Sequence, residues 1–246
     1  MLKLTTETGR VMREDEPLEE LGISTYDRLR DAVKAGDKET ALQLIDYVQH
    51  EWKGLHDVYV DWCYAFLTWI ADNCGEEKLP EVFRYCQGKV SIAFYDQMKG
   101  LKTLKQKVEW QAEQMRAHRS GPGETGTIKI WEEEDRYVIS CDPCGAGGRV
   151  RRTGELDKTP PRTGPPFNLG VTKKEYPWSW NMKGIPYYCL HCCIWHEIVP
   201  MEKGGAPYIT GYSTDPNGPC EFYFYKDPKL IPEEYYKRVG HEKPRK

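Results

Sequence analysis

Cys141-Asp142-Pro143-Cys144-Gly145 and Cys189-Leu190-His191-Cys192 are the two stretches around which this sequence is arranged. Each Cys-x-x-Cys pair places two sulfurs on one tight turn, and two such turns facing each other supply a tetrahedral metal site. Pro143 favours the turn, and Gly145 lets the chain fold back so that backbone N–H groups can point at the sulfurs. The spacing therefore predicts one metal ion bound by Cys141, Cys144, Cys189 and Cys192.

The expected ion is zinc, with iron as the second choice, because both suit a tetrahedron of thiolates. Four protein ligands leave no position for water, which favours a structural ion over a catalytic one. His191 and Cys193 flank the last ligand and can each replace it. The alternative is four unrelated buried thiols. The Cys-x-Pro-Cys-Gly turn resembles the knuckles of zinc ribbons, a resemblance that covers only these few residues and implies no function.

Composition limits the classes of protein to be considered. A chain of 246 residues, 39% of them hydrophobic, can hold one large domain or two small ones. A net charge of -3 gives no basic field, so nucleic acid is not an expected partner. No apolar run is long enough to span a membrane, and the N-terminus lacks the apolar stretch of a signal peptide. The nine cysteines are therefore interpreted as thiols and metal ligands of a cytoplasmic protein.

Helical periodicity dominates the first half of the chain. Residues 1–23 are acidic and unpatterned, which predicts a loose arm with a short helix. Residues 24–119 are predicted to form a helical bundle, with Thr25 and Asp37 as helix caps. In its central helix, the stripe Val58, Trp62 and Phe66 and the adjacent Tyr59, Cys63, Leu67 and Ile70 form a wide apolar face that is expected to pack inside the bundle. The expected breaks or ends of its helices are Gly36, Gly54, Gly75 and Gly100.

The sequence pattern of the second half is typical of strands and turns, so the predicted fold class of the whole chain is α+β. The glycine-rich stretch 120–126 is the expected boundary, followed by a β-rich metal-binding domain over 127–238 and a frayed tail over 239–246. Residues 153–186 are rich in proline and glycine and are expected to form a long loop, held at both ends by the metal, that acts as a lid. The expected strands cover 127–131, 136–140, 193–199, 208–212 and 221–225.

An anion site is predicted directly after the first cysteine pair. Gly147 and Gly148 allow backbone N–H groups to form a nest, and Arg149 adds a positive charge. No helical pattern follows, so this stretch is not a nucleotide-binding loop. The alternative is a flexible turn with solvated arginines.

Two further groups are candidates for acid–base chemistry. Asp57 and Asp61 share one face of a helix and repel each other unless a cation relieves them, and His56 is adjacent in sequence. A solvated charged face is the alternative. His196 follows the second cysteine pair, and on a strand it faces away from Glu197. It is a candidate catalytic group or a group supporting the metal ligands, and a satisfied interior histidine is the alternative.

Aromatic residues crowd the second half of the sequence. Most are expected to pack in the core, but Trp178 and Trp180 lie in the irregular loop and are expected to contact a ligand. Two classes of function follow. The first is an enzyme or binding protein for a small, anionic or aromatic molecule held between the bundle and the metal domain. The second is an interaction or regulatory module whose cysteine turns bind a protein or nucleic acid. A protein partner or a homo-oligomer is compatible with either, and the sequence does not decide whether the protein is an enzyme.

Overall fold

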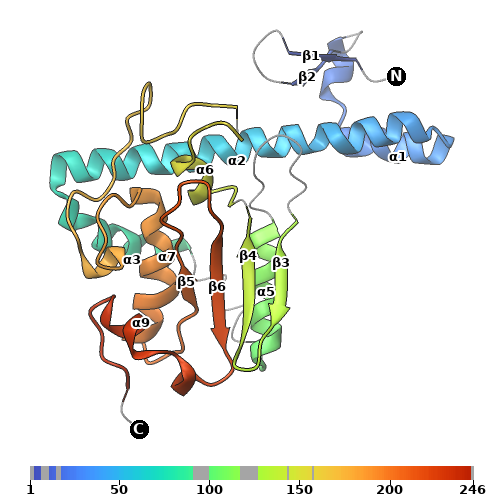
Figure 1. Ribbon diagram of the computed structural model, residues 1–246. Coiled ribbons are helices and arrows are strands. Elements are labelled where there is room, and N and C mark those ends of the chain that lie inside the picture. The colour runs from blue at the N-terminus through green and yellow to red at the C-terminus, as the bar shows by residue number, and fades with distance from the viewer. Residues whose placement is uncertain are drawn as a thin grey trace. The chain divides into compact units, whose positions relative to one another are not determined.

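The computed structural model describes residues 3–6, 11–14, 18–90, 100–116, 127–142, 144–156 and 158–244. The chain divides into two compact units, Met1–Tyr59 and Val60–Lys246. Helices and antiparallel strands occur together, so the predicted α+β class is confirmed (Figure 1). The boundary expected at 120–126 lies outside the described residues, and the two units instead divide the chain within helix α2 (Lys38–Cys74).

Capping residues explain where the helices of the first unit begin and end. Ser24, not the predicted Thr25, caps α1 by accepting a hydrogen bond from a backbone N–H of the first turn. Gly36 ends α1 with a φ of 74°, and Asp37 accepts a backbone N–H at the start of α2, as the sequence predicts. The elements of this unit are β1 (Leu4–Thr5), β2 (Met12–Arg13), the 3₁₀ helix η1 (Leu18–Gly22), α1 (Thr25–Ala35) and the first part of α2.

Helix α2 runs unbroken for 37 residues, so the break predicted at Gly54 is wrong. An interior glycine costs a helix only about 1 kcal/mol relative to alanine, which the turns on either side offset. Lys53 and Asp57 also bridge this position, because their side chains form an ion pair one turn apart with Nζ 2.5 Å from Oδ1. The helix therefore continues through a residue that sequence rules treat as a stop.

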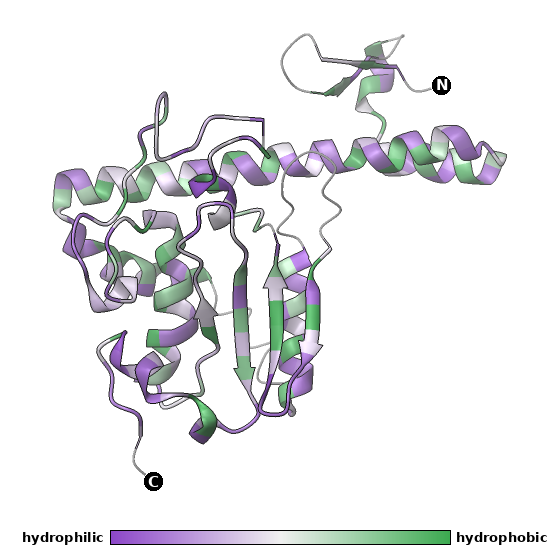
Figure 2. Ribbon diagram, in the orientation of Figure 1, coloured by the Kyte–Doolittle hydropathy of each residue, from purple (hydrophilic) through white to green (hydrophobic). Residues whose placement is uncertain are grey.

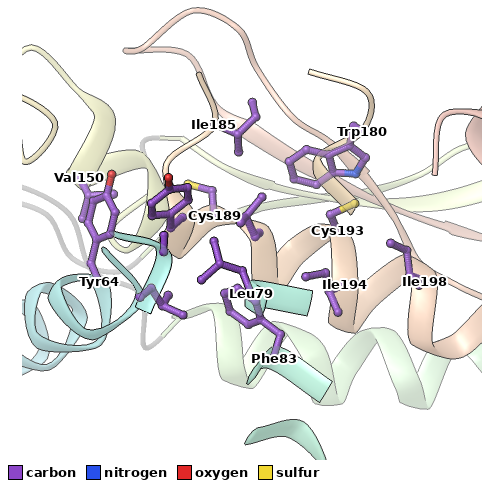
Figure 3. Packing of buried hydrophobic residues seen from close by; sticks show 14 of the residues in the cluster. Tyr64, Leu79, Phe83, Val150, Trp180, Ile185, Cys189, Cys193, Ile194 and Ile198 are labelled. Carbon is purple, nitrogen blue, oxygen red and sulfur yellow. The ribbon is translucent and has the colours of Figure 1, made fainter. Parts of the chain in front are cut away.

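Only part of the apolar face predicted for α2 is buried: Leu67 lies in the core and Ile70 packs against it, but the predicted stripe does not. Val58, Trp62 and Phe66 are each more than half exposed. Both sides of the helix are apolar, so the pattern alone could not decide which of them the core would cover. The buried side carries Val60, Tyr64, Leu67 and Ala71, which pack in one cluster with residues of α3 (Leu79–Val90) and later segments (Figure 3).

A four-stranded antiparallel sheet, ordered β3-β4-β6-β5, forms the centre of the second unit. Its strands β3 (Lys129–Glu132), β4 (Arg136–Cys141), β5 (Ile209–Gly211) and β6 (Cys220–Tyr225) match four of the five predicted strands. Apolar residues recur along β4 and β6 (Figure 2), and helix α5 (Leu104–Arg116) covers one face of the sheet. The ladder places Cys141 directly opposite Cys220.

The fifth predicted strand, residues 193–199, is wrong because this segment is helical. It runs as α7 (Leu190–Cys193), the π-helix η5 (Ile194–Ile198) and α8 (Val199–Glu202). A run of β-branched residues suggests a strand, but a helix buried on nearly all sides has the same apolar composition. Ile194, Ile198 and Val199 are all buried.

The long segment over residues 153–186 is tied to its neighbours at several points. The hydroxyl of Tyr64 donates to the carbonyl of Gly170 at 2.8 Å, and the Gly170 N–H donates to Thr68 Oγ1 at 3.0 Å. Glu76 accepts from both Lys173 N–H and Tyr176 Oη at 2.8 Å. These bonds hold the middle of the segment against α2 and the turn that follows it, which a freely moving lid would not show.

The remaining elements of the second unit are short. The frayed tail predicted from residue 239 is wrong at its start, because Val239 is buried in the main cluster. None of the described helices has the length and apolar character needed to cross a membrane. The short elements are η2 (Glu76–Lys78), α6 (Gly147–Arg151), η3 (Pro177–Ser179), η4 (Tyr187–Cys189), η6 (Pro228–Leu230) and α9 (Glu233–Lys237).

Two glycines of this unit should respond in opposite directions to alanine. Gly88 lies in the last turns of α3 and Gly184 lies in a turn with a φ of 79°, and an added Cβ would meet nothing within 4 Å at either. Gly88→Ala should therefore raise the free energy of unfolding by roughly 0.5–1 kcal/mol. Gly184→Ala should lower it by about 1–2 kcal/mol, since left-handed backbone is strained for alanine. Chemical denaturation measures both, and equal effects would contradict the assigned backbone conformations.

Candidate functional site

The four predicted metal ligands come from two separate elements of the second unit. Cys141 is the last residue of β4, and Cys144 follows in the turn that leads to α6. Cys189 ends η4, and Cys192 lies in α7. Cys141 and Cys189 are buried, whereas Cys144 and Cys192 are partly exposed. The sulfurs are thus carried by ends of regular elements and not by long loops.

Close backbone packing brings the two cysteine pairs together. A Cβ on Gly147 would lie 2.8 Å from Cys189 Sγ, and a Cβ on Gly148 would lie 2.7 Å from Cys144 Cβ. Any larger residue would force these groups apart. The predicted absence of a helix here is wrong, because α6 begins at Gly147, and both glycines serve the approach of α6 to the thiols.

Cys220 joins this group, although it is not among the predicted metal ligands. It starts β6 opposite Cys141, and Arg151 Nη2 lies 3.5 Å from its sulfur. The only sequence signal was a cysteine at the start of a predicted strand, with no second cysteine nearby to form a pair. We call Cys141, Cys144, Cys189, Cys192 and Cys220 the thiol cluster.

The electrostatics of the cluster reflect its burial. Burial raises the pKa of Cys141, and the neighbouring thiols of Cys144 and Cys220 raise it further. Burial likewise raises the pKa of Cys189 and Cys192, and it raises the pKa of Cys220 to about 11. These thiols are protonated at neutral pH unless a cation stabilises the thiolates.

The arrangement is not that of a formed metal site. Within the described part of the chain, no three His, Cys, Asp or Glu side chains are grouped as ligands around an ion. The four-thiolate site therefore remains a prediction, and binding an ion would require thiol side chains to turn toward a common point. The donor set itself suits the expected metals, because thiolates are the preferred ligands of tetrahedral zinc and of iron.

The two residues that could replace a ligand occupy different surroundings. His191 Nδ1–H donates to the Tyr188 carbonyl at 2.5 Å, and its Nε2 lies 3.4 Å from Cys192 Sγ. Burial lowers the pKa of His191, so the ring is neutral. Cys193 Sγ instead lies 3.7 Å from the carbonyl of Pro177, and Figure 3 shows it beside Trp180. His191 thus faces the thiol cluster, whereas Cys193 belongs to the core.

A cavity of about 890 Å³ borders the thiol cluster. All five thiols line it, together with parts of α2, α3, α5 and the π-helix. Its walls are mostly apolar, and a volume of this size is typical of small-molecule sites. The aromatic residues of its lining are Phe66, Phe83, Trp110, Tyr188, Trp195, Tyr208, Tyr212 and Phe222.

The predicted anion-binding arginine has a protein counter-ion. Arg149 Nη2 lies 2.5 Å from Asp61 Oδ1, and Arg162 Nε lies 2.8 Å from Asp61 Oδ2. Arg149 is buried and Asp61 is only a quarter exposed. The carboxylate therefore serves both guanidinium groups, and Gly147 and Gly148 face sulfur. A ligand role for Arg149, Gly147 and Gly148 remains a prediction that these contacts do not favour.

The carboxylates expected to act together have separate partners. Asp57 pairs with Lys53, and His56 Nδ1 lies 3.0 Å from Asp57 Oδ1. Asp61 pairs with Arg149 and Arg162 instead. Each carboxylate thus has its own cationic partner. A shared acid–base role for His56, Asp57 and Asp61 remains a prediction.

His196 lies on the cavity wall, among aromatic rings. Its ring lies 4.2 Å from that of Tyr208 and 5.8 Å from that of Phe222, between centroids. The expectation that His196 and Glu197 sit on a strand is wrong, since both lie on the π-helix η5. Glu197 is fully buried, where it accepts from Thr210 N–H at 2.9 Å and pairs with Arg238 at 2.8 Å. Burial raises the pKa of Glu197, and Arg238 opposes that effect.

The two loop tryptophans lie outside the lining of the cavity. Trp180 is buried, donates its Nε1–H to Glu197 Oε1 at 2.9 Å and stacks on Tyr212. Trp178 stacks on Tyr176 with ring centroids 4.1 Å apart. Their packing accounts for both rings, and their ligand role stays an untested prediction.

Comparisons with known proteins add no assignment. No protein-family model matches the chain, and neither curated proteins nor solved structures give a match.

Neutralising the shared carboxylate should destabilise the second unit. Asp61→Asn would leave Arg149 and Arg162 without their common counter-charge, and we expect a loss of roughly 2–4 kcal/mol in unfolding free energy. Asp72→Asn is the matched control, because the Asp72–Lys173 pair is exposed and should change stability by less than about 0.5 kcal/mol. Urea denaturation followed by near-ultraviolet circular dichroism measures both. Equal losses in the two variants would show that the buried pair has no special role.

Proposed function

We propose that this chain is a zinc-binding protein that holds a small, largely apolar molecule in the cavity beside its thiol cluster. The observation that carries the proposal is that five cysteines from three segments line that cavity, with Cys141 paired opposite Cys220 in the sheet. Zinc remains the first choice of ion and iron the second, on the chemistry of the thiols. On this proposal the cysteine turns form a zinc-knuckle domain, and the protein works in the cytoplasm.

The position of the thiols favours a small-molecule function over an interaction module. A knuckle that recognises a protein or nucleic acid presents its turns to solvent, whereas here one cysteine of each turn, Cys141 or Cys189, is buried and the other is only partly exposed. The arginines next to the first pair are also buried and bonded within the chain, so they provide little charge for phosphates. Nucleic acid is therefore not a proposed partner.

A zinc ion held by thiolates would have a structural part in this function. It would fix the ends of β4, α6 and α7, each of which contributes residues to the lining of the cavity. The rest of the lining supplies apolar and aromatic surface with a few polar groups, which suits an aromatic molecule carrying one or two hydrogen-bonding groups. Chemistry on that molecule is not part of the proposal, because no described group stands out as an activated nucleophile or base.

The purified full chain should contain about one zinc ion per molecule. Cys141→Ser and Cys189→Ser should each reduce the bound zinc to near zero. Cys74→Ser should leave it unchanged, because Cys74 is exposed at the end of α2 and outside the thiol cluster. Elemental analysis measures the zinc content. Release of zinc to a chromogenic chelator, after the cysteine thiols are modified by a thiol-blocking reagent, measures it independently.

The pH dependence of zinc binding provides a control. Burial raises the pKa values of these thiols, so zinc must displace protons in order to bind. The affinity for zinc should therefore decrease as the pH is lowered. The decrease should be up to about tenfold per pH unit for each proton displaced. A folded protein that contains neither zinc nor iron after expression in metal-supplemented medium would contradict the metal proposal.

The cavity should bind the probe 1-anilinonaphthalene-8-sulfonate in a saturable manner, with one molecule per chain. Cys86 lines the cavity, so Cys86→Trp should weaken binding about tenfold or more by occupying space. Tyr85→Trp is the control, since Tyr85 is exposed on the same helix and outside the lining. Fluorescence titration of the zinc-loaded protein measures both, and identical affinities in the two variants would rule out the cavity as the binding site.

A further inference from the structure

Helix α2 carries an exposed apolar stripe with the spacing of a coiled coil. Its apolar residues recur at alternating intervals of three and four, which is the a and d pattern of a heptad repeat. The helix is one continuous element, so this spacing follows from helix geometry. The members of this stripe, which we call the α2 seam, are Ile45, Val48, Trp52, Leu55, Tyr59, Trp62, Phe66 and Trp69.

The aromatic members of the seam are exposed to an unusual degree. Trp52, Tyr59, Trp62, Phe66 and Trp69 are between 54% and 61% exposed. At about 150–250 Å² per aromatic side chain, and with the aliphatic members added, the seam presents roughly 700–800 Å² of apolar surface. The largest apolar patch of a typical monomer is about 300–600 Å². A standard interface buries about 800 Å² on each partner, which the seam alone nearly provides.

The positions that flank the seam are poor in charge. A helix face that stays in water normally carries charged residues, and coiled-coil flanks carry them when they select among partners. Here Glu51 is the one carboxylate among eight flanking positions, and it accepts a hydrogen bond from Thr25 at 2.8 Å. Two identical seams would therefore meet without like-charge repulsion. The flanking residues are Leu44, Gln49, Glu51, His56, Val58, Cys63, Ala65 and Ile70.

We propose that the α2 seam is the interface of a homodimer, in which α2 of a second copy packs along it. Three observations favour a second copy over another partner. Two copies of the same heptad pattern can align, so their side chains can interdigitate. A two-fold pair is also the commonest assembly of identical chains. The exposed area suffices for a stable dimer. The flanks carry no charge pattern that would select a different sequence.

The test uses sedimentation equilibrium of the full-length, zinc-supplemented protein over a range of micromolar concentrations. The wild type should behave as a dimer that dissociates on dilution, with a red shift of tryptophan emission. The double variant Trp62→Glu, Trp69→Glu should weaken dimerisation about 100-fold or more, because tryptophans at the centre of an interface contribute most of the binding energy. Neither residue lines the cavity, so the cavity should keep its affinity for the naphthalene probe.

Tyr85→Glu is the matched control, because Tyr85 is 67% exposed on α3 and outside the seam. It should dimerise as the wild type does. A wild type that stays monomeric at the highest concentration, forms larger assemblies, or binds lipid vesicles as a monomer overturns the proposal. So does a dimer that the double variant retains. If that variant does not fold, the concentration dependence of the wild-type mass and emission still decides between dimer and monomer.

Discussion

The close approach of α6 to the cysteines is the constraint on which the rest of the second unit depends. Gly147 and Gly148 lie so close to Cys189 and Cys144 that a Cβ at either glycine would clash with the cysteine side chain. Once the backbone is held there, the next three arginines have fixed directions. Arg149 reaches Asp61 on α2, Arg151 reaches the carbonyls of Ser213 and Gly218 before β6, and Arg152 donates to the carbonyl of Cys144 at 2.6 Å. One short helix thus joins α2, the sheet and the first cysteine turn.

This glycine-arginine stretch has the composition of an anion-binding site, but its contacts give it a structural role. Glycines and arginines after a fixed turn are typical of a phosphate nest, but here the donors are used inside the protein. Arg151 also lies over the ring of Tyr212, which stacks on Trp180, and Trp180 donates to buried Glu197. The charges near the thiol cluster are therefore used to order the fold, which leaves the cavity wall largely apolar.

Sequence reasoning succeeded where one residue determines local geometry. Gly36 and Asp37 ended and began helices as expected, and alternation predicted β4 and β6. It failed where tertiary burial decides the outcome. Residues 193–199 form a helix that is buried on nearly all sides, and its continuous apolar run is equally typical of a buried strand. For α2, apolar residues occur on both sides, so the sequence does not show which side the core covers. For the candidate site, paired spacing identified four of the five clustered cysteines, whereas Cys220 joins them through strand pairing that no local motif records.

The thiol cluster and the apolar cavity are consequences of the same burial, and the proposed ion links them. Burial raises the pKa of Cys141, Cys189 and Cys192, so without a cation the cavity wall carries neutral thiols. A dication would allow thiolates to exist in such surroundings, because Arg151 lowers the pKa of Cys189 and Cys220 by less than burial raises it. On the proposed function, binding of the ion would therefore tie the second cysteine pair to β4 and β6, which the sheet already joins through the pairing of Cys141 with Cys220. The wall of the cavity would gain rigidity from the metal, and its shape would depend on whether the metal is bound.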